Sequence, residues 1–560
     1  MSRSHRVVDH IVGRLAAHGV EHIFGVDGAN IEDLYDAAYF HNGLTAVLAK
    51  HEFAAGTMAD GYARAGARIG VVAATSGGGS LNLVAALGES FTSRVPVLAL
   101  VGQPPRTMDG RGSFQDTSGA NGSLDAEALF SAVSVFCRRV LDPHDIVTAL
   151  GQALAAARQH GGPAVLLLPK DVQQSEIRPV PEVVPTTSIP LGNPAVIAER
   201  LRSARGAVTI VAGEQIARDD ARDELERLRA ILRARVATVP DAKDVGGAPG
   251  LGSSSALGVT GVMGHPGVAA AIADSAVCLL IGTRFPVTAR AGLDAALAAV
   301  PVLSLGAAVP FPDAVHVHTD DLRGSLTILN TALSGPGRPT GVTVPERIAH
   351  TELQPPAHVG NGIRYRDAIT ALDHALPEGA DIVVDAGNSG AAAIHQLPVR
   401  RGGRFLVALG MGGMGYSFGA GIGMCFARGR RTVILAGDGS FYMHGMELHT
   451  AIQYRLPVTV VLFNNNAHAM CVTREQLYYD GAYSYNRFTP SRLGAGLAAM
   501  FPGLPAVDVS EPGELTRALR DALAAEGPAV VSIECSADEI PPFAPFLANK
   551  EDATHVTTRS

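Results

Sequence analysis

The stretch Thr432–Asn465, TVILAGDGSFYMHGMELHTAIQYRLPVTVVLFNN, decides the fold. Its two apolar runs, Thr432–Ala436 and Val458–Phe463, have the length and composition of buried strands, and a helical stretch lies between them. A helix between two strands carries the chain back to the end at which the first strand began. Neighbouring strands that are joined in this way therefore run parallel. The stretch therefore predicts a parallel sheet that is covered by helices.

The same alternation of strand-like runs and helical patterns recurs along the chain and falls into three groups. Connectors rich in proline, glycine or threonine separate the groups at residues 179–194 and 334–362. We therefore predict an α/β fold of three consecutive doubly wound parallel-sheet domains, at residues 1–178, 190–335 and 360–540. The further strands expected are Val71–Thr75, Val97–Val101, Ala164–Leu168, Ala207–Val211, Val277–Ile281, Val302–Leu305, Ile382–Asp385 and Ala529–Ile533.

Composition excludes several classes of protein. The chain has 560 residues, 47% of them hydrophobic, which is enough for about three domain cores. Its net charge is -8 with no basic tract, so we expect no nucleic-acid partner. Residues 1–10 carry no apolar signal core, and no apolar run reaches the roughly 20 residues of a membrane span. Five cysteines without a CxxC pair favour a reduced, cytoplasmic protein.

Polar residues follow both strands of the opening stretch. Gly437-Asp438-Gly439-Ser440 ends the first strand, and Asn464-Asn465 ends the second. Open α/β sheets bind ligands at the carboxyl ends of their strands. A carboxylate and an amide suit Mg²⁺, which prefers oxygen ligands and takes several of them from a phosphate. Each pair alone is equally typical of an ordinary turn, but the two together at strand ends favour a metal–phosphate site.

Gly437-Asp438-Gly439, followed after 24 intervening residues by Asn464-Asn465, closely resembles the diphosphate–Mg²⁺ motif of thiamine diphosphate enzymes. The whole string is similar to the acetolactate synthase (acetohydroxyacid synthase) branch. Similarity extends over nearly the whole chain and is weakest in the central unit and the C-terminal tail. It includes FGVDGANIEDLYDA from Phe24, KHEFAAGTMADGYARA from Lys50, TSGGGSLNLVAAL from Thr75, VGQ from Val101, FQD from Phe114 and GPAVLLLPKDV from Gly162.

The resemblance implies domains, cofactors and an activity. The three units would be a pyrimidine-binding, a central and a diphosphate-binding domain, and the cofactors thiamine diphosphate and Mg²⁺. The enzyme would decarboxylate a 2-keto acid such as pyruvate and transfer the acyl unit to a second carbonyl compound. It would be a homodimer or homotetramer whose active sites lie at the subunit interface.

The resemblance implies three catalytic residues, Glu52, Gln115 and Met414, of which Glu52 and Met414 would act on the cofactor itself. Glu52 alone is better explained as a helix-capping residue, but the resemblance implies that it bonds N1′ of the aminopyrimidine. Met414, in the Gly410–Gly415 segment, matches the bulky residue that bends the cofactor and brings its 4′-nitrogen to C2, although a methionine is more often core filling.

The resemblance implies further contacts. Asp438, Asn465 and the Ala467 carbonyl would bind the metal. Asn388 and Ser389 match residues that hold the diphosphate, although helix capping explains them nearly as well. Gln115 would lie near the reacting carbon and Met470 at the substrate channel, whereas His468 is more easily explained as structural. The full cofactor set is Gly28, Glu52, Thr75, Gln103, Gly387, Asn388, Ser389, Gly412, Met414, Asp438, Gly439, Ser440, Asn465, Ala467, His468 and Met470, and the substrate set is Phe114, Gln115, Met470 and Arg474.

Two departures from the family pattern affect the substrate and a flavin. Arg474 stands where branched-chain synthases carry a tryptophan at the acceptor pocket, and this chain has no tryptophan. An arginine there could bind an acceptor carboxylate, or lie at the surface. The contacts expected for FAD are only partly present, in Thr260–Gly267 and Gly282–Phe285, which leaves a flavin open.

Other functions compete with carboligation. Gly410–Gly415 satisfies GxGxxG after the apolar run Phe405–Leu409, as in an NAD(P)-dependent oxidoreductase, but that motif explains neither Glu52 nor Asn464-Asn465. A 2-keto acid decarboxylase would keep the cofactor, yet the paired histidines of such enzymes are absent. A non-catalytic homologue is the third alternative, and intact Glu52, Met414, Asp438 and Asn465 disfavour it.

Overall fold

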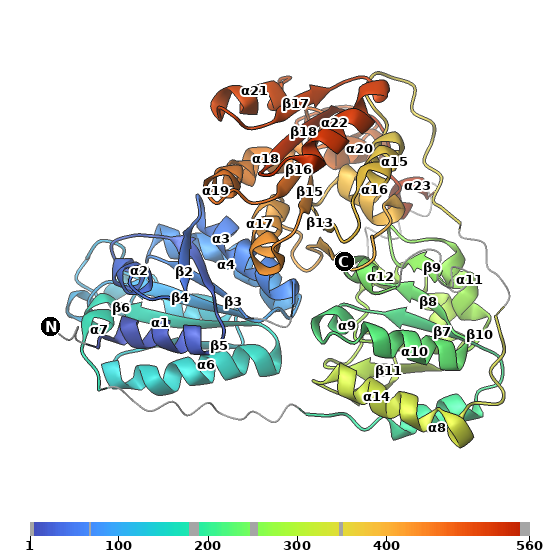
Figure 1. The fold of residues 1–560 in the computed structure, drawn as a ribbon, viewed down its shortest axis with the longest axis horizontal. Coiled ribbons are helices and arrows are strands. Elements are labelled where there is room, and N and C mark those ends of the chain that lie inside the picture. The colour runs from blue at the N-terminus through green and yellow to red at the C-terminus, as the bar shows by residue number, and fades with distance from the viewer. Residues whose placement is uncertain (1–4, 67–68, 179–189, 247–255, 346–350, 549–560) are drawn as a thin grey trace. The chain divides into compact units, whose positions relative to one another are not determined.

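The computed structural model describes residues 5–66, 69–178, 190–246, 256–345 and 351–548. They form three six-stranded parallel sheets interleaved with helices (Figure 1), which confirms the predicted fold class. The predicted connector at 179–194 lies mostly outside the described residues. The described part of the connector at 334–362 contains the short 3-10 turn Gly335–Gly337 and no α-helix or strand.

The first sheet has the strand order β2-β1-β3-β4-β6-β5. Helices α1, α2 and α6 share a hydrophobic core on one face, whereas α3 and α4 pack on the other (Figure 1). Its strands are β1 (His22–Val26), β2 (Thr45–Leu48), β3 (Gly70–Ala74), β4 (Val97–Gln103), β5 (Phe136–Arg139) and β6 (Pro163–Pro169). Its helices are α1 (Val7–Ala17), α2 (Glu32–Tyr39), α3 (Glu52–Arg64), α4 (Gly78–Thr92), α5 (Ala126–Ser131), α6 (Ile146–His160) and α7 (Lys170–Gln174).

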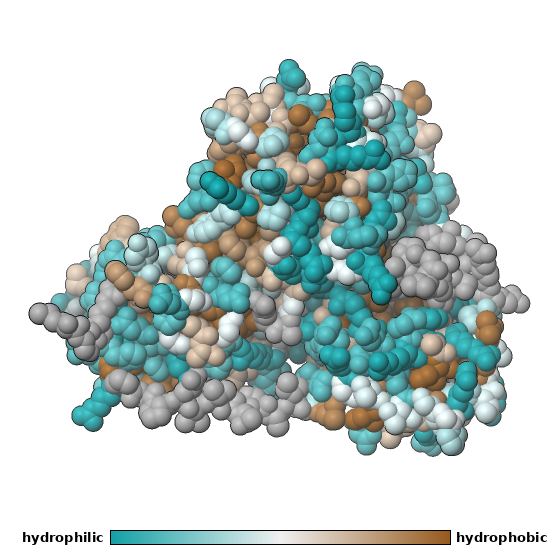
Figure 2. All heavy atoms as spheres, viewed as in Figure 1, coloured by the Kyte–Doolittle hydropathy of each residue, from teal (hydrophilic) through white to brown (hydrophobic). Residues whose placement is uncertain are grey.

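The second sheet has the order β12-β11-β10-β7-β8-β9 and its own hydrophobic core. Leucines at 225, 228 and 232 turn one face of α10 inward, and its outer face is hydrophilic (Figure 2). The strands are β7 (Ala207–Ala212), β8 (Arg235–Thr238), β9 (Ala256–Val259), β10 (Ser275–Ile281), β11 (Val302–Gly306) and β12 (Val315–His318). The helices are α8 (Ala195–Ser203), α9 (Gln215–Arg218), α10 (Arg222–Leu232), α11 (Gly267–Ala273), α12 (Val287–Arg290), α13 (Asp294–Ala298) and α14 (Leu322–Ala332).

The third sheet has the order β14-β13-β15-β16-β18-β17, so the two strands of the opening sequence stretch, β15 and β16, are neighbours at its centre. Its strands are β13 (Asp381–Val384), β14 (Phe405–Val407), β15 (Thr432–Gly437), β16 (Val458–Asn464), β17 (Ala506–Val509) and β18 (Ala529–Glu534). Its segment also contains α15 (Tyr365–Ala375), α16 (Asn388–Gln396), α17 (Tyr416–Arg428), α18 (Asp438–His444), α19 (Leu448–Gln453), α20 (Ala469–Tyr478), α21 (Leu493–Met500), α22 (Pro512–Ala524) and α23 (Ala544–Leu547).

By its contacts the chain divides into two compact units, a division that the sequence does not predict. One unit contains the first sheet with its helices, together with Ala408–Thr432 and Phe441–Val458. The other contains the second sheet and most of the third. Helix α17, which follows a strand of the third sheet in sequence, therefore belongs to the same unit as α3.

Glycines allow α3 and α17 to cross at very short distance. A Cβ atom on Gly61 of α3 would lie 2.1 Å from the Ala420 carbonyl oxygen, and one on Gly423 of α17 would lie 2.0 Å from the Met58 carbonyl oxygen. Both obstacles are backbone atoms, which cannot move aside as a flexible side chain can. The crossing therefore requires glycine on both helices.

This crossing predicts that Gly61→Ala destabilises the protein, although alanine is intrinsically the better helix former by about 1 kcal/mol. Forcing a methyl group against backbone costs about 1–3 kcal/mol or more, so the thermal unfolding midpoint should fall. Gly13→Ala in α1 is the matched control, because no atom lies within 4 Å of the added Cβ, and its midpoint should hold or rise. An unchanged midpoint for Gly61→Ala would mean that the two helices separate without cost.

Candidate active site

The first unit gathers predicted cofactor residues at the carboxyl ends of β1, β3 and β4. Gly28 lies after β1, and a Cβ there would come within 2.8 Å of the Thr75 side chain, which follows β3. The Thr75 hydroxyl accepts a hydrogen bond from the Asn30 backbone at 3.2 Å. These residues thus form one polar cluster at the edge where such sheets bind ligands.

Glu52 is the first residue of α3 and does not cap the helix. His51 is the cap, since its Nδ1 accepts the Phe53 backbone N–H at 3.0 Å. The Glu52 carboxylate is half-buried and turned toward α4, where Asn82 Nδ2 donates to Oε2 at 2.9 Å. A Cβ on Gly79 would lie 2.9 Å from Oε1, so glycine leaves room for the carboxylate. This placement leaves Glu52 available for chemistry.

Gln115 joins the same cluster from a different segment. Its Oε1 accepts from the Ser76 hydroxyl at 3.2 Å, and that hydroxyl accepts from Asn30 Nδ2 at 2.7 Å. Gln115 has a backbone φ of +59°, a conformation that non-glycine residues seldom adopt. Phe114 beside it is 77% exposed and touches no core. The structure therefore brings Gln115, but not Phe114, to the cluster.

Gln103 plays a supporting part in this unit. It is fully buried at the end of β4, its Nε2 donates to the Thr117 hydroxyl at 3.1 Å, and its Oε1 accepts from Arg139 Nε. Both ends of its amide are thus engaged by protein. Through Thr117, the Gln103 side chain holds the segment that carries Gln115 in place.

The Gly410–Gly415 segment, with Gly412 and Met414, lies between β14 and α17 in the first unit. The backbone N–H groups of Gly410, Met411 and Gly412 all donate to the carboxylate of Glu89 on α4. In a dinucleotide-binding motif such N–H groups and the following helix would bind a pyrophosphate. Here a protein carboxylate already occupies them, which disfavours the oxidoreductase alternative.

Asp438 is the central residue of the second unit's cluster. It follows β15, is fully buried, and both of its carboxylate oxygens lack a hydrogen-bond partner. Burial raises its pKa to about 6, opposed by nearby backbone N–H groups that include those of Ala467 and Asn465. A buried, unpartnered carboxylate is costly unless a cation or a proton accompanies it.

Asn465 lies beside Asp438 at the end of β16. Its Oδ1 accepts the Ala467 N–H at 3.1 Å, and its Nδ2 donates to the Tyr365 hydroxyl at 3.2 Å. Neighbouring Asn464 instead donates to Ser491 and Glu534, so its side chain connects parts of the fold and is not directed to Asp438. Asn465 is thereby held next to Asp438.

Asn388 and Ser389 open α16 and are both buried. The N-cap is Gly387, at a φ of +110°, so neither polar residue caps the helix. Asn388 Nδ2 donates to the Glu539 carbonyl, and its buried Oδ1 has no partner. Gly439 and Ser440 follow Asp438 in the first turn of α18, where the Ser440 hydroxyl donates to Asp385 at 2.8 Å. Ser440 is thus already engaged.

The residues after Ala467 differ in their surroundings. His468 packs its ring edge-on against Phe488, as a structural histidine would. Met470 is half-buried on α20, and Arg474 follows one turn later on the same helix face. Arg474 is exposed, and its guanidinium lies 5.9 Å from the centre of the Phe546 ring.

Sequence reasoning missed four residues that hold predicted site residues in place. Asn82 bonds Glu52, Glu89 bonds Gly412, and Tyr365 bonds Asn465. The fourth is Glu539, whose carboxylate accepts a hydrogen bond from the Tyr365 N–H. Burial raises the pKa of Glu539 to about 7. Asn82 lies within the quoted TSGGGSLNLVAAL segment, which was the available signal. The other three lie outside the quoted motifs.

The second unit's cluster fits a magnesium–diphosphate group by its chemistry. Unpartnered buried oxygens occur on Asp438 and Asn388, and the donors are carboxylate, amide and main-chain oxygens, as Mg²⁺ prefers. In the described residues no three His, Cys, Asp or Glu side chains form a metal cluster, so a metal here needs amide and carbonyl ligands.

No described helix is long and apolar enough to cross a membrane.

Comparisons with known proteins agree with this arrangement. Residues 5–123 match the "Thiamine pyrophosphate enzyme, N-terminal TPP binding domain", residues 195–303 the central domain and residues 385–533 the C-terminal TPP binding domain of the same enzymes. Thiamine pyrophosphate is another name for thiamine diphosphate.

Similar proteins include a probable acetolactate synthase large subunit of Methanocaldococcus jannaschii, 29% identical over 96% of this chain and 93% of that protein. The acetolactate synthase large subunit of Porphyra purpurea is 26% identical over 97% and 94%, and the isozyme 2 large subunit of Escherichia coli K12 is 26% identical over 97% and 98%. Together with the three matched domains, these relatives show that the chain belongs to the thiamine diphosphate-dependent enzymes of the acetolactate synthase-like type.

Proposed function

We propose that this enzyme is a carboligase that uses thiamine diphosphate and Mg²⁺ to decarboxylate a 2-keto acid, pyruvate, and to join the two-carbon unit to a second carbonyl compound. The observation that carries the proposal is the fully buried, unpartnered carboxylate of Asp438 beside Asn465 and Ala467. In this proposal Asp438, Asn465 and the Ala467 carbonyl bind the metal, and Asn388, Ser389 and Gly439 hold the diphosphate.

When bound, thiamine diphosphate supplies a carbon nucleophile that adds to the donor's keto carbon and allows carbon dioxide to leave. Glu52 would hold the proton that it shares with N1′ of the aminopyrimidine. Asn82 supports this role, because its amide bonds one carboxylate oxygen and leaves the other for the cofactor. Gly412 and Met414 would contact the aminopyrimidine and bend the cofactor, and Gln115 would face the reacting carbon.

The net reaction breaks the bond between the donor's carboxyl and keto carbons and forms a bond to the acceptor's carbonyl carbon. The acceptor oxygen takes up a proton, and no oxidant or reductant is needed. A flavin is therefore not required by this chemistry, and the two segments of partial flavin resemblance, Thr260–Gly267 and Gly282–Phe285, need no role in it.

Arg474 supports an acceptor that carries a carboxylate. It lies one turn beyond Met470, its Nη1 donates to Cys471 Sγ at 3.8 Å, and it has no carboxylate partner among the described residues. A guanidinium that has no carboxylate partner offers a planar fork that matches a carboxylate. We therefore propose that a second 2-keto acid is preferred to a neutral aldehyde.

Two further parts of the proposal concern assembly and location. The family resemblance supports a homodimer or homotetramer in which Glu52 serves the cofactor of another subunit. All five cysteines are free, which supports a reducing, cytoplasmic environment.

Product analysis tests the proposed reaction. Purified protein with thiamine diphosphate, Mg²⁺ and pyruvate is given a neutral aldehyde or a second 2-keto acid, and the products are identified by mass spectrometry. Hydroxyketone or hydroxyketo acid products support carboligation. Acetaldehyde and carbon dioxide alone would show a simple decarboxylase instead.

Asp438→Asn should weaken Mg²⁺-dependent cofactor binding by roughly tenfold to a hundredfold, since a charge-assisted contact contributes about 1.5–3 kcal/mol. Titration calorimetry measures the affinity. Asp381→Asn is the control. Asp381 is equally buried but begins β13, so it lies at the edge of the same sheet opposite to Asp438, and this variant should bind the cofactor normally. Unchanged affinity in Asp438→Asn would remove this residue from the metal site.

Glu52→Gln should retain cofactor but lose most of the exchange of the C2 proton for deuterium, because an amide cannot share its proton as a carboxyl does. Nuclear magnetic resonance follows the exchange in the bound cofactor. Glu32→Gln is the matched control, since Glu32 also begins a helix of the same sheet but pairs with Lys170. Exchange at the wild-type rate in Glu52→Gln would exclude the proposed role.

Arg474→Leu should lower the use of carboxylated acceptors about tenfold or more and leave neutral acceptors unchanged, because only the former lose a charge-assisted pair. Competition between a 2-keto acid and an aldehyde, read out by mass spectrometry, gives the ratio. Arg517→Leu on α22 is the control for losing an exposed arginine. If the acceptor ratio stays the same, Arg474 does not bind the acceptor.

A further inference from the structure

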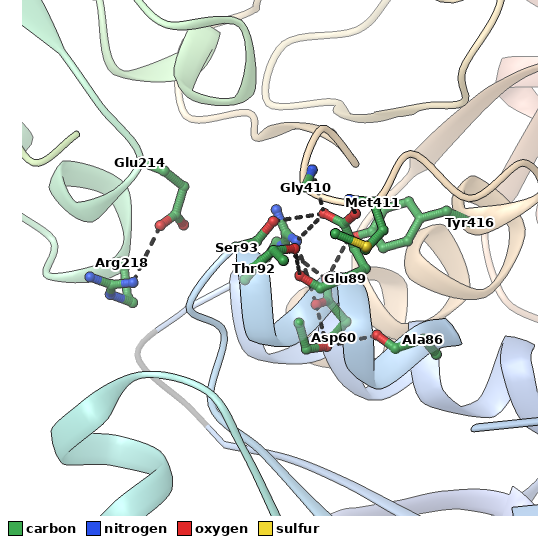
Figure 3. A network of polar contacts seen from close by, with 12 residues as sticks. Asp60, Ala86, Glu89, Thr92, Ser93, Glu214, Arg218, Gly410, Met411 and Tyr416 are labelled. Carbon is green, nitrogen blue, oxygen red and sulfur yellow. Dashed lines mark hydrogen bonds and ion pairs between the residues drawn. The ribbon is translucent and has the colours of Figure 1, made fainter. Parts of the chain in front are cut away.

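One buried carboxylate binds three consecutive backbone N–H groups of the Gly410–Gly415 segment. Glu89 lies on α4 and is 3% exposed. Its Oε2 accepts from Met411 at 2.6 Å and from Gly412 at 3.2 Å, and its Oε1 accepts from Gly410 at 3.2 Å. Figure 3 shows the carboxylate directed at this backbone.

Neighbouring groups keep this carboxylate ionised. Burial alone would raise the pKa of Glu89, but the charge of Arg64 and the N–H of Met411 hold the pKa below its usual value. Arg64 Nη2 lies 3.2 Å from Oε1, and the Ser93 hydroxyl donates to the same oxygen at 2.7 Å. The carboxylate is thus charged and fully coordinated, as a buried charge must be.

The network continues to the helix on the other side of the segment. Arg64 also pairs with Asp60 at 2.7 Å, and Asp60 accepts the hydroxyl of Tyr416, the first residue of α17. Asp60 and Arg64 lie on α3, the helix that begins at Glu52. The segment is therefore held by polar contacts to α4 along its first part and to α3 at its end (Figure 3).

The segment's own side chains contribute little to its shape. Four of its six residues are glycines, the Met411 side chain is 60% exposed, and Gly412 has a backbone φ of +65°. A glycine-rich segment has many accessible conformations and few side-chain contacts to select one. The bonds to Glu89 therefore restrict the backbone conformation of Gly410, Met411 and Gly412.

We propose that Glu89 is a positioning residue, which fixes the backbone from Gly410 to Gly412 so that Gly412 and Met414 are presented to the aminopyrimidine in one conformation. This inference rests on the proposed function, in which those two residues contact the cofactor. Glu89 itself touches neither cofactor nor substrate. Its effect reaches the reaction only through the segment that it holds.

Glu89→Gln tests the inference in the full-length protein. An amide presents one acceptor oxygen and one NH₂ group, and the NH₂ group faces backbone donors where the carboxylate accepted their bonds. We expect amide hydrogen exchange of peptides covering residues 408–416 to accelerate at least tenfold in cofactor-free protein. At saturating cofactor, C2 proton exchange should slow at least tenfold, and cofactor affinity should stay within about threefold, because the diphosphate site lies elsewhere.

Controls separate positioning from general destabilisation. Glu224→Gln alters another buried glutamate with an arginine partner, on α10 under the second sheet, and should change none of the three readouts. Glu89→Asp keeps the charge for Arg64 but withdraws the carboxylate from the segment. It should change the readouts in the same direction and serves if Glu89→Gln does not fold.

The outcomes distinguish this inference from the proposed function. If the 408–416 amides exchange as in wild type, Glu89 does not hold the segment and the inference is wrong. If they accelerate but C2 exchange is unchanged, the segment is held without consequence for the cofactor, and the inference is again wrong. Absence of C2 exchange in the wild type would instead overturn the proposed function, while the amide exchange still decides whether Glu89 holds the segment.

Discussion

The crossing of α3 and α17 is the contact on which the first unit's geometry depends. Gly61 and Gly423 let the two helix backbones approach until there is no space for a methyl group between them. Glu52 begins one of these helices, and the segment with Gly412 and Met414 leads into the other. Since both groups are attached to one tightly packed pair, a small change in the crossing would displace the proposed proton-sharing group and the proposed cofactor-bending residue together.

A comparable constraint acts on α16 in the second unit. The start of this helix carries Asn388 and Ser389, and its end is bound by Lys243, whose ammonium donates to the carbonyls of Ala393 and Ile394 at 3.0 and 2.6 Å. A cation at a helix C-terminus stabilises the helix through its dipole, although burial lowers the pKa of Lys243 to about 7. Lys243 lies in the second-sheet region, in the 3-10 segment Pro240–Val245. The central domain thus supports the helix that is proposed to hold the diphosphate.

Most central strands could be predicted from the sequence, with the exceptions of β1 and β8, whereas most edge strands could not. Strands such as β3, β4 and β6 are buried on both faces, so they read as unbroken apolar runs. The edge strands β5 (FCRR), β12 (VHVH) and β17 (AVDV) face water on part of their surface and carry polar residues that occur equally in loops. Phe405–Leu409 was recognised as strand-like because β14, although at an edge, is fully buried.

The three-sheet fold, the family and the closeness of Asp438 to Asn465 could all be predicted from the sequence. Neighbouring parallel strands end at one edge of a sheet, so residues that follow β15 and β16 must lie close together. The contact of Glu89 with Gly410 is visible only in the tertiary structure, because the two residues are 321 positions apart in the chain. Its partners are backbone N–H groups, and these are the same for every residue except proline. They leave no signature in the sequence, so a site held by backbone donors becomes visible only when the chain has folded.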